Sequence, residues 1–168
     1  MSAILSECGK YRYRLTRDLG MMGDGALCFV MLNPSTADAE QDDPTIRRCI
    51  GYARSFGAAR LEVVNLFAYR STDPGVLSAM SRDTAVGPEN DDHILDVVKR
   101  SRLVLCGWGN HGALFGRAEE VSKLIGSVTM PHALKINVKT GQPAHPLYLK
   151  GDAKPLPLVS ATRGTANQ

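Results

Sequence analysis

Polar side chains capable of holding a ligand stand at the ends of the apolar runs in this sequence. Asn33 follows the run ALCFVML and precedes Pro34 and Ser35, whereas Asn65 follows LEVV. A buried carboxamide has up to four hydrogen bonds to satisfy, and base edges or backbone groups can supply them. The proline stiffens the first loop, which can therefore hold a water molecule or a polar ligand. The alternative is a simple turn, because Asn-Pro and Ser-Thr are common turn sequences.

Two later loops carry groups suited to binding an anion or stabilising negative charge. Trp108, Asn110 and His111 share the segment GWGNHG, where free N–H groups ahead of a helix can receive a phosphate or carboxylate. This segment lacks the GxGxxG and Walker patterns, so its glycines can equally serve a tight turn. Gln142 and His145 lie in GQPAHP, and an imidazole beside a proline suits donation to a developing oxyanion. A lone histidine is, however, more often structural.

The charge of the chain is mildly basic. Its formal net charge is +3 and its pI is near 8.7, which permits a nucleic-acid or nucleotide partner without requiring one. Arg47 and Arg48 on an expected helix and Arg70 in an expected loop are candidate phosphate contacts. For each of them, an ordinary solvated surface charge is the alternative.

The elements that must position these residues alternate between strand and helix. Apolar runs predict buried strands, helical spacing predicts helices that open at Asp43 and near Gly87, and period-two alternation near residue 11 predicts an edge strand. This alternation predicts a three-layer α/β/α domain with a mainly parallel, four-stranded central sheet. Ligands of such sheets bind beyond the carboxyl ends of the strands, where the candidate residues lie. The expected strands are 11–15 (edge), 26–32, 61–66, 103–106 and 133–138, and the expected helices are 43–57, 74–80, 87–100 and 113–125.

Length and composition set the remaining expectations. A chain of 168 residues with 43% hydrophobic and 22% charged residues is typical of one globular domain, which we place at 1–150, with an irregular tail at 151–168. The four cysteines are isolated and no histidine has zinc-finger spacing, so we expect neither a disulfide nor a metal or other cofactor. We also expect a cytoplasmic protein, because no apolar stretch is long enough to span a membrane and the amino terminus lacks a signal pattern.

Several motifs together resemble a known bacterial family, the domain of unknown function 1643. The resemblance covers roughly residues 11–149. More distantly, Asn33-Pro34 after one strand, Asn65 after the next and a closing His145-Pro146 are similar to the uracil-DNA glycosylase-like superfamily. The motifs of the first resemblance are LNPSTAD (32–38), DPTIRRC (43–49), VVNLFAYRSTDP (63–74), GPEND (87–91) and GQPAHPLYL (141–149).

The second resemblance implies a role for three residues and a glycosylase-like fold. Asn33 matches the asparagine that positions the hydrolytic water, and Asn65 matches the one that reads the edge of the flipped base. His145 matches the histidine that stabilises negative charge on the departing pyrimidine. The sequence departs from those enzymes at Ser35, where they have a glycine, and after His145-Pro146, where their serine and intercalating segment are missing.

Three functional hypotheses follow. The first is a glycosylase-fold protein that binds a nucleobase, nucleotide or nucleic acid and hydrolyses an N-glycosidic bond, with Asn33 and His145 catalytic. The second is a non-catalytic nucleic-acid-binding accessory protein, and the third is a small-molecule enzyme of the nucleotide pool. In the first, the substrate contacts would be Pro34, Ser35, Asn65, Arg70, Trp108, Asn110, His111 and Gln142.

Overall fold

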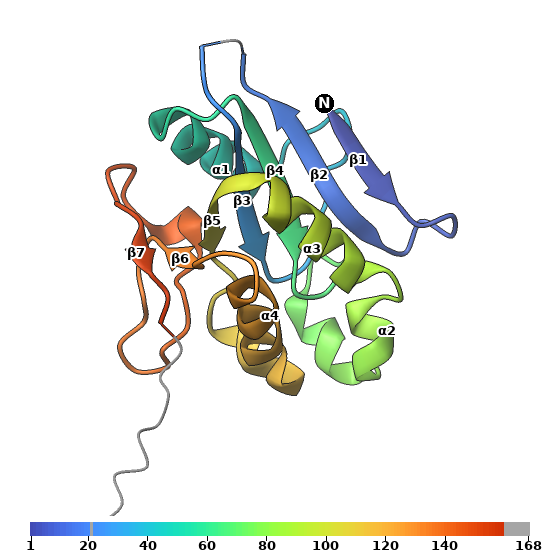
Figure 1. Cartoon of the computed structure of the whole chain (residues 1–168). Coiled ribbons are helices and arrows are strands. Elements are labelled where there is room, and N and C mark those ends of the chain that lie inside the picture. Colours follow the sequence, from blue (N-terminus) through green and yellow to red (C-terminus); the bar gives the residue numbers. More distant parts are fainter. Residues whose placement is uncertain (21, 160–168) are drawn as a thin grey trace, which may run out of the picture.

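The computed structural model, which describes residues 1–20 and 22–159, contains one mixed sheet (Figure 1). Within these residues the sheet has seven strands in the order β1-β2-β4-β3-β5-β6-β7, so the expected count of four is wrong. The strands are β1 (Ser2–Leu5), β2 (Arg12–Asp18), β3 (Ala26–Met31), β4 (Arg60–Asn65), β5 (Ser101–Cys106), β6 (His132–Ala133) and β7 (Leu156–Pro157).

The centre of the sheet is parallel. β3 pairs in parallel with β4 and β5, and β5 pairs in parallel with β6, while antiparallel pairings join β2 to β4, β1 to β2 and β7 to β6. The register sets Met31 beside Asn65 and Val30 beside Cys106. The carboxyl ends of β3, β4 and β5 therefore meet at one edge of the sheet, as ligand-binding α/β sheets require.

Helices cover both faces of the sheet (Figure 1). The apolar residues of α1 (Pro44–Ser55) pack with alternate residues of the strands, such as Phe29 and Val63. α3 (Asn90–Arg100) and α4 (Arg117–Gly126) pack on the opposite face with the intervening residues, such as Val30 and Val64. This confirms a mixed α/β architecture with helices on both faces of the sheet.

Several expected boundaries differ from the structure. The predicted edge strand is β2, which lies inside the sheet because β1 covers its outer side. The predicted strand 133–138 shrinks to β6, because Lys135 and Ile136 instead pair with the returning segment at Ala144 and Pro143. The predicted helix 113–125 is a 3-10 segment, η2 (Asn110–Gly116), followed by α4.

The rest of the chain adds short elements. The short helix expected at 74–80 is the 3-10 helix η1 (Pro74–Ala79), and α2 (Arg82–Val86) was not expected. A further 3-10 turn is η3 (Pro146–Tyr148). The expected irregular tail includes β7, and its last nine residues, 160–168, lie outside the described part of the chain.

No helix in residues 1–20 and 22–159 combines the length and the apolar character needed to cross a membrane. Cys28, Cys49 and Cys106 are buried thiols and Cys8 is exposed, all of them free. The same residues contain no cluster of three histidine, cysteine or acidic side chains arranged to hold a metal ion.

Candidate functional site

A cavity of about 610 Å³ lies at the carboxyl edge of β3, β4 and β5, between the amino terminus of α1 and the segment 144–149. Sheet alternation carries Asn65 to the same face as Val63, so its side chain lies on the side covered by α1. The cavity brings together seven of the ten residues predicted from the sequence: Asn33, Ser35, Asn65, Trp108, Asn110, His111 and His145.

Asn65 lines this cavity and carries an unpaired polar atom. The residue ends β4 and is 1% exposed, yet its Nδ2 atom has no hydrogen-bond partner among the described residues. Its backbone is well held, because Asn90 Nδ2 donates to the Asn65 carbonyl at 2.9 Å. Nearly all buried polar groups in proteins are hydrogen-bonded, so the unpaired Nδ2 atom makes this cavity-lining residue a candidate ligand contact.

Asn33 also lines the cavity, and its side-chain nitrogen is already hydrogen-bonded within the protein. Asn33 Nδ2 donates to the carbonyl oxygens of Ser71 at 2.9 Å and Pro34 at 3.2 Å. The Ser71 amide in turn donates to the Pro34 carbonyl at 2.9 Å, which joins the loop after β3 to the loop after β4. The side-chain oxygen of Asn33 is thus the atom with which this residue can accept a hydrogen from water or a ligand.

His145 caps the amino end of η3, and its ring is oriented by the backbone that follows it. The Leu147 amide donates to His145 Nδ1 at 3.2 Å, so in the neutral ring the proton resides on Nε2. Burial lowers the pKa of His145 below its ordinary value, although the nearby Asp43 carboxylate partly opposes that shift. At neutral pH the side chain is therefore a hydrogen-bond donor without charge.

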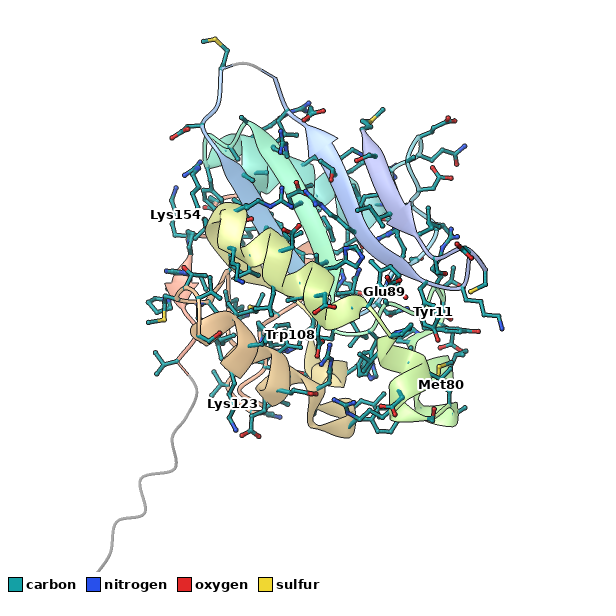
Figure 2. All side chains as sticks on the ribbon, turned by 45° about the vertical axis from the view of Figure 1, so that its right-hand side comes forward. Tyr11, Met80, Glu89, Trp108, Lys123 and Lys154 are labelled. Carbon is teal, nitrogen blue, oxygen red and sulfur yellow. The ribbon has the colours of Figure 1, made fainter. Side chains whose placement is uncertain are left out.

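Trp108 forms part of the inner wall. It is 2% exposed and packs in the core between the sheet and helices α3 and α4 (Figure 2). Its Nε1 atom donates to Gln142 Oε1 at 2.7 Å. Gln142 itself does not line the cavity, and its contact is with the indole. Gln142 therefore fixes the orientation of Trp108.

The rim loop 107–112 does not lead directly into an α-helix. The Gly109 amide donates to the carbonyl oxygen of Pro143, and the Gly112 amide donates to the carbonyl oxygen of Gly109. Helix α4 starts only at Arg117. Asn110 and His111 are exposed at the rim. Asn110 Oδ1 accepts from Asn137 Nδ2 at 2.9 Å and from Thr140 Oγ1 at 2.7 Å, which ties two rim loops together.

Pro34 and Arg70 are the last of the ten predicted catalytic and substrate contacts, and neither lines the cavity; the candidate phosphate contacts Arg47 and Arg48 do not line it either. Pro34 is buried and contributes its carbonyl to the loop contacts described above. Arg70 donates to the carbonyl of Gly9 at 3.3 Å, on the side of the first hairpin. Both residues support the loops around the cavity.

Three charged residues of the cavity wall, Arg12, Asp43 and the exposed Lys135, were missed in the sequence. Arg12 on β2 is 2% exposed, donates to the Ala37 carbonyl, and leaves its Nε atom without a partner in the described chain. Burial lowers the pKa of Arg12 to about 10, and Asp43 partly offsets the effect. Asp43 was interpreted only as a helix cap, and Asp43 Oδ1 does accept the Ile46 amide at 2.8 Å. The available signal for Arg12 in the sequence was its place in the period-two alternation that predicts a strand near residue 11.

One family model matches the chain, that of the family described as "Protein of unknown function (DUF1643)", over residues 12–147. The chain belongs to this family. Searches of curated proteins and of solved structures each gave no match. The matched range begins at Arg12 and ends at Leu147, so the DUF1643 region contains every residue of the cavity wall except Tyr148 and Leu149.

The DUF1643 chain holds its cavity loops with two further buried arginines. Arg17 on β2 is 2% exposed and donates to Asp42 Oδ1 at 2.7 Å, which anchors the loop that leads to Asp43. Arg117 is fully buried, donates to the Leu66 carbonyl at 2.8 Å and pairs with Asp91. These contacts tie the loop before α1 to β2, and the segment after β4 to the first turns of α3 and α4.

Proposed function

We propose that this protein binds a nucleobase in the cavity and hydrolyses the N-glycosidic bond that joins the base to its sugar. The observation that carries the proposal is the unpaired, buried Nδ2 atom of Asn65 in a cavity that Asn33 and His145 also line. The volume of about 610 Å³ is within the roughly 300–1,000 Å³ typical of small-molecule sites. The parallel core of the sheet supports the finer assignment to a uracil-DNA glycosylase-like fold.

The chemistry of Asn65 limits the class of base. A carboxamide presents one donor group beside one acceptor, so it pairs with an edge that presents a carbonyl beside an N–H. Uracil-type pyrimidines and hypoxanthine carry such an edge. Trp108 adds an apolar aromatic wall, which suits the flat face of the ring.

The residues around the base can divide the hydrolysis between them. Water attacks the sugar C1′ atom, the C–N bond breaks, and its electron pair leaves on the base. We assign the positioning of that water to Asn33 Oδ1, and acceptance of its proton to Asp43 Oδ2, since Asp43 is the carboxylate that lines the cavity. The Nε2–H group of His145 donates to the negative charge that appears on the base, which then takes up a proton.

The test is release of free base. Purified protein would be incubated with single-stranded oligonucleotides containing uracil or hypoxanthine, and the free base would be measured by chromatography. We expect release by the wild type and a fall of about 100-fold or more for His145→Ala. Binding without release would favour the non-catalytic accessory protein, and release only from nucleosides or nucleotides would favour an enzyme of the nucleotide pool.

A further inference from the structure

A second groove runs along the outer side of α1, next to the cavity. It has a volume of about 490 Å³, and Leu147 lines both the groove and the cavity. The two hollows are therefore neighbours that share Leu147 as a lining residue. The groove is lined by Pro44, Arg47, Arg48, Gly51, Tyr52, Leu147 and Gly151.

This groove is positively charged. Arg47 and Arg48 lie on its wall, no carboxylate is among the residues that line it, and the first turn of α1 has no acidic residue. Each arginine makes one hydrogen bond to the backbone. Arg47 Nη1 donates to the carbonyl oxygen of Asp42 at 2.6 Å, and Arg48 Nη2 donates to the carbonyl oxygen of Leu149 at 2.7 Å. A guanidinium has five N–H donors, so most of those on each residue are available to an anion.

An exposed aromatic side chain lies next to the residue that the groove and the cavity share. Tyr148 lines the cavity, follows Leu147 directly and is 84% exposed. Its ring lies 5.6 Å from the ring of His145, measured between centroids. An exposed tyrosine beside a base-sized cavity has an apolar face in water, and stacking of a second base would cover that face.

We infer that the groove and Tyr148 bind a single strand of nucleic acid. The phosphodiester backbone contacts Arg47 and Arg48, and the base next to the one in the cavity stacks on Tyr148. This inference rests on the proposed function, because it takes the cavity as the place of the target base. A basic groove combined with an exposed aromatic platform is the arrangement that single strands require, since their bases are already unstacked.

The test measures strand binding by fluorescence anisotropy, with labelled oligo(dT), labelled oligo(U) and a duplex of the same length. We expect either single strand to bind more tightly than the duplex. The double variant Arg47→Glu, Arg48→Glu should weaken single-strand binding by about tenfold or more. Arg54→Glu is the control, because Arg54 is an exposed residue of the same helix that lines neither hollow. The affinity of this variant for the single strand should stay within about twofold of the wild type.

Two further measurements distinguish loss of a specific contact from loss of the folded structure. Arg47→Gln with Arg48→Gln should lower the slope of log affinity against log salt by about 1.4, since each phosphate contact contributes about 0.7 for a single strand. Tyr148→Ala should weaken binding by about fivefold or more without changing that slope. Equal affinities for the double variant and Arg54→Glu, or tighter binding of the duplex, would overturn the inference. Arginine-dependent strand binding without base release would instead refute only the proposed hydrolysis.

Discussion

Gly107 packs directly against Pro146, because a Cβ atom at Gly107 would lie 2.9 Å from Pro146 Cδ and 3.3 Å from Met31 Sδ. The Gly107 amide also donates to the Val30 carbonyl at 2.9 Å, which extends the pairing of β5 with β3. The end of β5 therefore fixes how closely the segment containing His145 approaches the sheet. A residue without a side chain at this point allows the imidazole to reach the cavity.

Gly107→Ala tests this relationship. The added methyl group must push Pro146 outward, so we expect a loss of about 1–3 kcal/mol in the free energy of unfolding and a displaced His145. Base release should fall by about tenfold or more, because small misplacements of a catalytic group are costly. Gly126→Ala is the control, since its Cβ would meet nothing within 4 Å. Urea unfolding and base release together would show whether the two substitutions differ as expected.

Asn65→Leu should stabilise the protein and abolish its function. The variant removes a buried donor that has no partner in the described chain, which costs about 1–3 kcal/mol, and replaces it with an apolar group of similar shape. We expect the free energy of unfolding to rise by about 1 kcal/mol and base binding to be lost. Asn90→Leu should have the opposite effect on stability, because Asn90 Nδ2 donates to the backbone carbonyl oxygens of Asn65 and Leu66. Destabilisation by Asn65→Leu would show that its amide has a structural role.

Asp43→Asn separates the two roles of this residue. Asparagine keeps an oxygen for the Ile46 amide and is as good a helix cap, so the free energy of unfolding should change by less than about 1 kcal/mol. The proton acceptor is lost, and base release should fall by about 100-fold. Asp43→Ala would lose both roles and should be less stable by about 1 kcal/mol. Unchanged release by Asp43→Asn would remove Asp43 from the mechanism.

The lowered pKa of His145 predicts a pH dependence of stability. Burial disfavours the charged ring, so the unfolded chain binds a proton at a higher pH than the folded protein. The stability contribution is fully present above the ordinary histidine pKa and is lost as the pH falls through the folded-state value. The melting temperature of the wild type should therefore fall more steeply between pH 7 and pH 5 than that of His145→Asn. Parallel curves for the two proteins would contradict the expectation.

The sequence predicted the central strands well because their signals are local. The apolar runs of β3, β4 and β5 identify strands buried on both faces, and the residue after such a run lies at the edge of the sheet. Asn33 and Asn65 could therefore be placed near each other without coordinates. The flanking strands were missed or misjudged because β1, β6 and β7 are two to four residues long and carry no distinct pattern.

The contacts of the site were harder to predict because they depend on distant residues. Arg12 reaches Ala37, 25 residues away, and Gln142 reaches Trp108, 34 residues away. Local patterns do not encode such pairs. Asp43 illustrates a different difficulty, since its position before a proline indicated a helix cap and gave no sign that the same carboxylate would face a cavity.

The most direct test of the central claim is an NMR titration of the Asn65 side-chain amide. Its two ¹H–¹⁵N signals would be identified by their absence from the spectrum of Asn65→Leu, and free uracil and hypoxanthine would then be added to the wild type. A base that pairs with Asn65 should shift these signals in a saturable way, together with the indole signal of Trp108. Signals of Asn65 that do not move at any concentration of either base would contradict a nucleobase site in this cavity.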